Sequence, residues 1–220
     1  MSKFKSFLLD RAIISNLVKH YGINSENNEI NDFLIELVEK ISDLELENKE
    51  LADKFDLDIF AKAYEKIVPH SQRKIMGEFF TPVNIVNSIL KSVGYTTQND
   101  INDRKLIDLS CGSGSFLVKA VEVLSNKINT NTEPTVEKAK EIIEKIINNI
   151  FGIDINPIAC ILCQINLYFI LFNLFNIILK HDKAYTIPLF NIFNKDAFKF
   201  EINEKYDFVL GNPPYLFIRA

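Results

Sequence analysis

The first third of the chain carries apolar residues at helical spacing and contains none of the short apolar runs that are typical of strands. One such pattern runs from Lys3 to His20 and ends at Gly22, and two more run from Glu29 to Leu51 and from Asp56 to Ile67. We therefore predict an α-helical N-terminal subdomain over residues 1–75. Its acidic outer face is typical of solvated surface rather than of a binding site.

The pattern changes after Ser71, where short apolar runs begin to alternate with longer segments at helical spacing. This alternation predicts an α/β fold with a parallel sheet. The four predicted strands are Lys105–Leu109, Ile150–Ile153 with Asp154 at its end, Phe190–Phe193, and Tyr206–Leu210.

Helix-start signals lie between these strands. Thr81 and Pro82 predict an N-cap and a first-turn proline for a helix that Gly94 ends. A glycine turn leads from the first strand into an apolar helix that begins at Phe116. Pro134 predicts the start of a further helix, and Asn156-Pro157 predicts the start of the next one.

The segment 158–179 has no charged residue and approaches the length of a membrane span. Four amides interrupt it, however, and it follows directly on a predicted strand. Buried amides are costly in lipid, whereas a helix covered on all sides by protein is apolar nearly all round. We therefore predict one buried helix here and no contact with a membrane. The amides are Gln164, Asn166, Asn173 and Asn176.

Composition narrows the class of protein. The 220 residues are 47% hydrophobic and 25% charged, as in ordinary globular proteins, and the net charge of −4 argues against a protein that coats nucleic acid. DNA as a substrate is still compatible with this charge. The N-terminus lacks a leader-like pattern and three cysteines do not suggest a disulfide framework, so we expect a cytoplasmic protein. Cys160 and Cys163 have redox-like spacing but are predicted to be thiols of the core.

The chemistry-bearing residues gather after the predicted strands. Asp108 ends the first strand, and the glycine turn CGSGS follows it. The turn lacks the Gly-Lys-Ser/Thr end of a nucleoside-triphosphate loop, and Leu117 stands where a dinucleotide loop has its third glycine. Alone, it fits a packing turn as well as a cofactor loop. Asp154 and Asp196 end the next two strands, and the three carboxylates together predict a ligand site at this edge.

These motifs, in this order, resemble those of the S-adenosylmethionine-dependent DNA adenine-N6 methyltransferases, especially type I modification subunits and type II restriction-modification methylases. The resemblance covers roughly residues 77–215 and implies a methyltransferase domain over 76–220. It also implies a partial Rossmann-like methyltransferase sheet with the strand order 3-2-1-4. Asp108-Leu109-Ser110 departs mildly from the Asp-Pro-Ala/Thr that the family often has. The matching segments are GEFFTP, DLSCGSGSF, FGIDINP, KDAF and GNPPY.

The resemblance assigns S-adenosylmethionine as the cofactor and implies a role for each motif. Phe80, Thr81 and Pro82 would lie along its methionine part, and Asp108 would hold its amino group. Cys111, Gly112 and Gly114 belong to the loop that would close over it. Asp154 would bind the ribose, and Ile155 would pack on the adenine. Asp196 would accept the adenine amino group, beside the backbone N–H of Ala197.

By the same resemblance, Asn212, Pro213, Pro214 and Tyr215 form the catalytic motif. An adenine amine is a poor nucleophile because its lone pair is delocalised into the ring. The Asn212 side-chain oxygen and the Pro213 carbonyl could accept its two N–H bonds and favour a pyramidal nitrogen. Tyr215 could stack on the target base, which must leave the duplex. Catalysis would then be alignment and polarisation, with no metal.

Three alternatives stay open: a protein-glutamine methyltransferase, an RNA methyltransferase, and a non-catalytic module that binds cofactor or a partner. The GEFFTP segment favours DNA over glutamine. Because only strands up to the catalytic motif are present, we expect an N-terminal portion of a larger methyltransferase. The remainder, with target recognition, would then lie in the same or another polypeptide. We expect the isolated chain to bind cofactor weakly at best and not to methylate DNA sequence-specifically.

Overall fold

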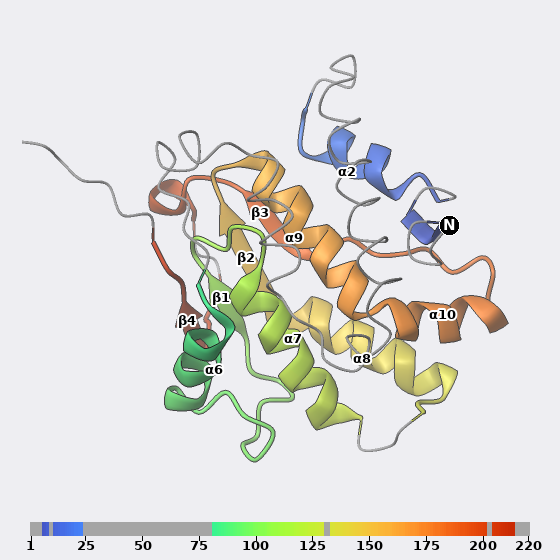
Figure 1. Ribbon diagram of the computed structural model, residues 1–220, viewed down its shortest axis with the longest axis horizontal. Coiled ribbons are helices and arrows are strands. Elements are labelled where there is room, and N and C mark those ends of the chain that lie inside the picture. The colour runs from blue at the N-terminus through green and yellow to red at the C-terminus, as the bar shows by residue number, and fades with distance from the viewer. Residues whose placement is uncertain (1–5, 9–10, 24–80, 130–132, 202–203, 214–220) are drawn as a thin grey trace, which may run out of the picture. The chain divides into compact units, whose positions relative to one another are not determined.

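The computed structural model describes residues 6–8, 11–23, 81–129, 133–201 and 204–213 (Figure 1). The chain divides into two compact units, Met1–Phe80 with Pro214–Ala220, and Thr81–Pro213. The second unit holds the sheet and every described residue of the candidate site.

In the first unit, residues 6–8 are helical and helix α2 spans Ile13–His20. The helix predicted over Lys3–His20 is wrong in one respect, because a turn at residues 11–12 interrupts it. Ala12 has a φ of 51°, a left-handed conformation that does not continue a right-handed helix. The helices predicted over 29–51 and 56–67 lie outside the described residues.

Four parallel strands form one sheet in the order β3-β2-β1-β4. The predicted fold class and strand order are therefore confirmed. Ile107 at the centre of β1 lies opposite Phe151 of β2 and Val209 of β4. Because all strands are parallel, their carboxyl ends share one edge of the sheet. The strands are β1 (Leu106–Asp108), β2 (Ile150–Asp154), β3 (Asn191–Asn194) and β4 (Phe208–Leu210).

The central strands are apolar on both faces, as expected for a parallel sheet that is covered on both sides. On one face Ile107, Phe151 and Ile153 form a buried cluster with partly buried neighbours that include Tyr206. On the other face helix α7 (Ser115–Ile128) approaches β2 closely. A Cβ on Gly152 would lie 2.6 Å from the Leu117 Cδ1 atom, so any other residue would force the Leu117 side chain to shift.

The other helices surround this arrangement (Figure 1). Helix α9 contacts β2, β3 and α7, and α10 contacts α8 and α9. Their bounds are α6 (Val83–Ser92), α8 (Val136–Asn149), α9 (Pro157–Ile170) and α10 (Phe172–His181), with a 3-10 turn η1 (Ala197–Lys199) after β3.

Three predicted helix starts are shifted and one is confirmed. Helix α7 begins at Ser115, one residue before the predicted Phe116. Pro82, not Thr81, is the N-cap of α6, and its carbonyl accepts the N–H groups of Ile85 and Val86. Thr135, not Pro134, caps α8, because its Oγ1 accepts the Lys138 N–H at 3.2 Å. Helix α9 begins as predicted, with Asn156 as its side-chain cap and Pro157 in the first turn.

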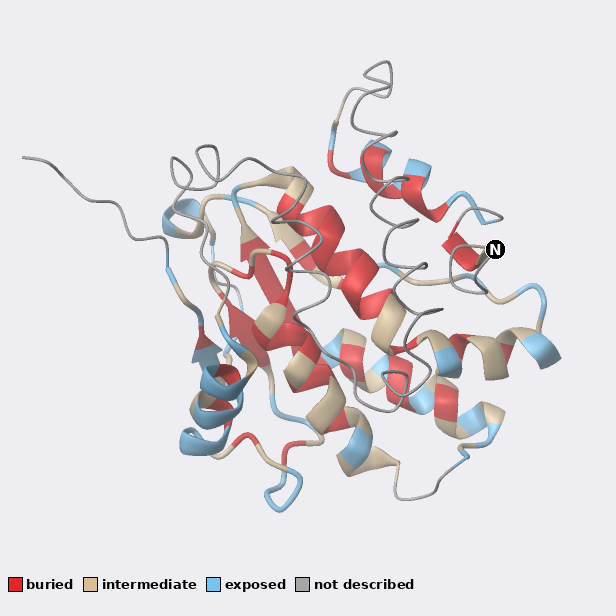
Figure 2. Ribbon diagram, in the orientation of Figure 1, coloured by how far each residue is buried: buried red, intermediate tan, exposed pale blue. Residues whose placement is uncertain are grey.

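The apolar segment 158–179 is two helices rather than one. α9 and α10 meet at Leu171 with a bend of 65°, which directs α10 along α8. α9 is buried as predicted, without interruption from Ala159 to Tyr168, and it is red over most of its length in Figure 2. No single helix of the described ranges is long and apolar enough to cross a membrane, and this pair passes that test only across its bend.

Candidate active site at the carboxyl edge of the sheet

The candidate site is built where the strands end. β1 and β2 end at Asp108 and Asp154, Asp196 follows β3 as the N-cap of η1, and Asn212 comes two residues after β4. The carboxyl edge thus collects three carboxylates and one amide from four strands. Open parallel sheets bind ligands in the crevice at this edge, where the strand order reverses between β1 and β4.

The loop between β1 and α7 depends on two glycines with positive φ. Gly112 has a φ of 53° and Gly114 a φ of 97°, both in the left-handed region that favours glycine. A Cβ on Gly114 would lie 2.7 Å from the Cys163 Sγ atom of α9, whereas a Cβ on Gly112 would meet nothing within 4 Å. The loop therefore presses against α9 at Gly114 and leaves open space at Gly112. We call residues 111–114 the glycine loop.

Asp154 fixes this loop to the end of β2. Its Oδ2 accepts the Gly112 N–H at 2.8 Å, and its Oδ1 accepts the Asn156 N–H at 2.8 Å. The Cys111 N–H also donates to the Ile153 carbonyl at 2.9 Å. Each carboxylate oxygen has a second lone pair, so Asp154 can still accept a hydrogen bond from a ligand hydroxyl.

Asp108 is a carboxylate in the interior, with 1% of its surface exposed. Burial raises its pKa to about 7, the Ser110 N–H at 3.0 Å from Oδ1 opposes this, and the charge of Asp154 adds to it. A Cβ on Gly211 would lie 3.0 Å from Asp108 Oδ1, so the backbone after β4 runs directly past this carboxylate. A ligand with a positive charge would stabilise the ionised form.

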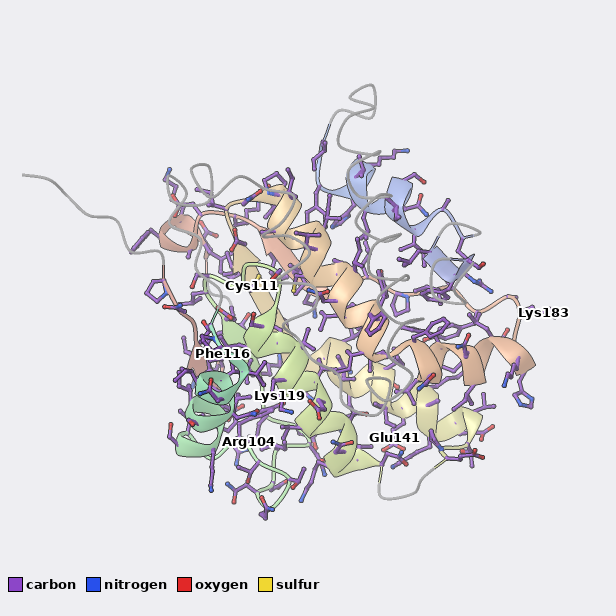
Figure 3. All side chains as sticks on the ribbon, viewed as in Figure 1. Arg104, Cys111, Phe116, Lys119, Glu141 and Lys183 are labelled. Carbon is purple, nitrogen blue, oxygen red and sulfur yellow. The ribbon has the colours of Figure 1, made fainter. Side chains whose placement is uncertain are left out.

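The three cysteines are free and buried, as predicted for Cys160 and Cys163. Cys111 lies in the glycine loop at the start of α7 (Figure 3). A hydrogen bond with Cys163 and burial raise the pKa of the Cys111 thiol. Its sulfur is therefore buried beside Cys163 of α9, and it also lies 3.1 Å from the position that a Cβ on Gly152 of β2 would take.

Some residues after β2 and β3 are exposed, whereas none of residues 109–114 after β1 is. Ile155 is 73% exposed and Phe198 is fully exposed. The Asn194 side chain ties the two strand ends together, because its Nδ2 donates to the carbonyls of Asp154 and Ile155 at 3.0 and 2.8 Å. We call Asp108, the glycine loop and Asp154 the inner half of the site, and Ile155, Asp196, Ala197 and Phe198 the outer half.

Asp196 is partly engaged within its own turn. Its Oδ1 accepts the Phe198 N–H at 3.0 Å, and Lys199 Nζ lies 3.5 Å from Oδ2. The cap places Ala197 and Phe198 in the 3-10 turn that follows. Phe198 had no predicted role, although the KDAF segment put an aromatic residue two positions after the acid.

Asn212 meets the start of the second unit across the crevice. Its Nδ2 donates to Thr81 Oγ1 at 3.2 Å, although 131 residues separate them in the chain. The Leu109 N–H donates to the Leu210 carbonyl at 3.2 Å and joins the ends of β1 and β4 just before. Within the part of the chain that the structure describes, no hydrogen bond reaches Asn212 Oδ1. Pro213 is exposed.

Three predicted site residues, Phe80, Pro214 and Tyr215, lie outside the described residues. Asp108, Asp154, Thr81 and Asn212 are brought to the same edge. One contact was missed by the sequence reasoning: Asn166 of α9 donates from Nδ2 to the Ser113 carbonyl of the glycine loop at 2.7 Å. The available signal was an amide inside an otherwise apolar helix.

Comparisons with known proteins agree on one family. The sequence profile of N-6 DNA methylases matches residues 55–217, more than half of the chain. The methylase subunit of the type I restriction enzyme MpnII of Mycoplasma pneumoniae is 28% identical over 195 residues. That match covers 83% of this chain and 30% of the relative, so the chain spans less than a third of that relative's length.

A solved structure is also similar in part. It is a modification subunit assigned to a type I restriction enzyme of Vibrio vulnificus YJ016, with 22% identity and a TM-score of 0.45. The match covers 72% of this chain and 28% of that chain.

Proposed function

Because the chain belongs to the N-6 DNA methylase family, we propose that its crevice takes part in methyl transfer from S-adenosylmethionine to the N6 amino group of adenine in DNA. The observation that carries the proposal is the meeting of two sequence-distant parts at one edge. The glycine loop and Asp154 lie after β1 and β2, and Asn212 lies after β4, the other neighbour of β1. This arrangement would put the binding site for the methyl donor beside the binding site for the base that accepts the methyl group.

The residues of the inner half fit the charged part of S-adenosylmethionine. That molecule has a positive sulfonium and an ammonium group, and a cation of this kind would stabilise the buried Asp108 carboxylate. The open space at Gly112 permits a ligand to approach the backbone closely. Asp154 has lone pairs for ribose hydroxyls. When bound, the cofactor would supply an electrophilic methyl group.

The outer half fits the flat apolar face of an adenine ring. Ile155 and Phe198 expose large apolar surfaces to water in the described part, and a ligand that covers them would gain free energy from the apolar area removed from water. Asp196 can accept from an exocyclic amine through a second lone pair, and Ala197 offers a backbone N–H. Cys111 would contribute through its backbone only, because its sulfur is buried beside Cys163.

On the acceptor side, Asn212 would hold the target amine. Its Nδ2 is occupied by Thr81 Oγ1, which orients the amide so that Oδ1 is the atom left to accept from an incoming N–H. The Pro213 carbonyl can accept the second N–H, and proline has no N–H of its own to compete for acceptors. Two acceptors on one amine favour a pyramidal nitrogen with a localised lone pair. Thr81, which the resemblance assigns to the cofactor, would also orient the Asn212 amide.

DNA would enter as a duplex with the target adenine turned out of the stack, since the amine is otherwise paired. The M. pneumoniae relative is a subunit of a type I restriction enzyme, so we propose that this chain also acts within a restriction-modification system. Target recognition and any nuclease would be supplied by further protein, in the same or another polypeptide. A DNA substrate of this kind places the reaction in the cytoplasm.

The test is methylation of adenine when the chain is expressed with the other genes of its restriction-modification locus. The host should lack adenine methyltransferases of its own, and modified bases are mapped along its genome. We expect N6-methyladenine at one recurrent sequence, and its loss in Asn212→Ala. Methylation of RNA or of glutamine in protein, with unmodified DNA, would replace the proposal with one of its rivals.

A further inference from the structure

Two buried amides on α9 are satisfied very differently. Gln164 is fully buried, its Nε2 donates to the Phe190 carbonyl at 2.9 Å, and its Oε1 accepts the Phe190 N–H at 3.1 Å. Asn166 is 2% exposed and donates to the Ser113 carbonyl at 2.7 Å, but its Oδ1 has no partner among the described residues. A buried acceptor without a partner is destabilising. Asn166 is therefore not placed for stability alone.

The bond from Asn166 reaches the most adaptable part of the glycine loop. Ser113 stands between Gly112 and Gly114, which both have positive φ. Glycine adopts either sign of φ at little cost, so the peptide groups on both sides of Ser113 have other accessible orientations. The hydrogen bond selects one of these, in which the Ser113 carbonyl oxygen points to the buried helix α9.

We propose that Asn166 is a positioning residue that holds the glycine loop in its cofactor-binding conformation from inside the protein. Cys163, three residues earlier on the same helix, is the surface on which Gly114 rests. The side chains of Asn166 and Cys163 thus contact the loop from α9, and Asp154 at the end of β2 accepts the Gly112 N–H. None of these contacts needs a ligand, so the loop is shaped before binding.

The role has a kinetic signature. If the loop interconverts among conformations without Asn166, only a fraction of molecules can bind, and the apparent affinity falls by that fraction. Loss of one neutral hydrogen bond corresponds to a reduction of about five- to tenfold. The loss of affinity should appear as a slower association rate, because the cofactor has the same contacts with the loop once the complex has formed.

The test compares Asn166→Leu with the matched control Gln164→Leu. Leucine removes the donor of Asn166 together with its unpartnered oxygen, so we expect unfolding by urea close to wild type and S-adenosylmethionine binding about five- to tenfold weaker through slower association. In Gln164→Leu two satisfied hydrogen bonds are lost, so stability should fall while affinity is unchanged. Equal affinity in Asn166→Leu and wild type would overturn the proposal.

A second readout needs no cofactor, which matters because the affinity arm rests on the proposed function. In nitrogen-15 spectra, the Gly112 and Gly114 amide signals should broaden or split in Asn166→Leu and stay sharp in Gln164→Leu. Failure of wild type to bind S-adenosylmethionine would contradict the proposed function and leave this readout intact. Sharp, unshifted loop signals in Asn166→Leu would contradict the positioning role itself. If Asn166→Leu does not fold, the wild-type protein still provides a test. Fast hydrogen exchange of the Asn166 side-chain amide protons would show that their bond to the Ser113 carbonyl is not kept, and would also contradict the positioning role.

Discussion

The inner and outer halves of the candidate site are built on opposite principles. The inner half is buried or half-buried, and its carboxylates accept backbone N–H groups: Asp154 accepts the Gly112 N–H of the loop and the Asn156 N–H after β2, and Asp108 accepts the Ser110 N–H. The outer half exposes Ile155 and Phe198; the Asp196 cap holds only its own turn, and Asn194 joins the ends of β2 and β3 beside it. One half is organised before a ligand arrives, and the other offers apolar surface.

This difference assigns different energetic tasks to the two halves. Burial raises the pKa of the Asp108 carboxyl and destabilises the ionised form in the unliganded fold, so on our proposal the inner half selects for positive charge. Exposed apolar residues cost the fold little and contribute affinity in proportion to the area that a ligand covers. Substitutions in the two halves should therefore separate stability from affinity.

The largest effect is expected for Asp108→Asn. Its folded pKa of about 7 lies above the unfolded value of 3.8, so the folded state binds more protons between these values and wild-type stability falls as pH rises through this window. Asparagine has no charge to bury, and we expect the unliganded fold at pH 8 to gain about 2 kcal/mol in urea unfolding. S-adenosylmethionine binding should weaken by about two orders of magnitude, because a buried charge partner is lost.

The exposed Asp100 supplies the control, since Asp100→Asn should change neither quantity. If Asp108→Asn were less stable than wild type at pH 8, the carboxylate would be a structural group and the assignment of the inner half would be wrong.

Substitution of the two glycines of the loop should change the free energy of unfolding by different amounts. Gly114→Ala combines a left-handed φ with a Cβ 2.7 Å from Cys163 Sγ, so we expect a loss of about 2 to 4 kcal/mol in unfolding free energy. Gly112→Ala has the same sign of φ but open space, and should cost about 1 kcal/mol. Urea titrations of both variants measure the difference, and equal costs would mean that α9 does not support the loop.

In the outer half, affinity should change without stability. We expect Phe198→Ala to weaken S-adenosylmethionine binding about five- to tenfold, as loss of an aromatic contact does, and to change the unfolding free energy by less than about 0.5 kcal/mol. Leu189→Ala removes an exposed side chain before β3, away from the carboxyl edge, and should leave affinity unchanged. A Phe198 variant that binds as wild type does would remove this residue from the site.

The smallest effect is on pH dependence. Between pH 7.5 and 6.5 the ionised fraction of Asp108 falls through its pKa of about 7, so S-adenosylmethionine affinity should fall about threefold. Asp108→Asn should show a flat profile over the same range. Calorimetric titrations at matched ionic strength provide the comparison, and a rise in wild-type affinity at the lower pH would contradict the charge assignment.

The strands and the approximate starts of several helices could be predicted because they depend on residues that are close together in the sequence. The strands are short apolar runs, and the turn chemistry around Asn156-Pro157 gave the start of α9 correctly. The bend at Leu171 was not predictable, because every residue from 158 to 179 is compatible with a helix and the break depends on packing of α10 against α8. The shift from Thr81 to Pro82 has a similar origin, since Thr81 engages Asn212 from the other end of the unit.

The candidate site, too, has features that the sequence predicts and contacts that it does not predict. Carboxylates at strand ends follow from sequence, because strand ends are local features. The links among them do not: Asn166 to Ser113, Asp154 to Gly112, and Asn212 to Thr81 all join residues that are far apart in the chain. Phe198 could be read as any surface aromatic until its turn placed it in the outer half.

We propose that this edge of the sheet selects S-adenosylmethionine by charge at the inner half. The most direct measurement is calorimetric titration of S-adenosylmethionine into the 220-residue chain at pH 7.5, followed by competition with S-adenosylhomocysteine and with ATP. We predict weak but saturable one-to-one binding that S-adenosylhomocysteine displaces and ATP does not. Displacement by ATP, or binding that survives unchanged in Asp108→Asn, would contradict it.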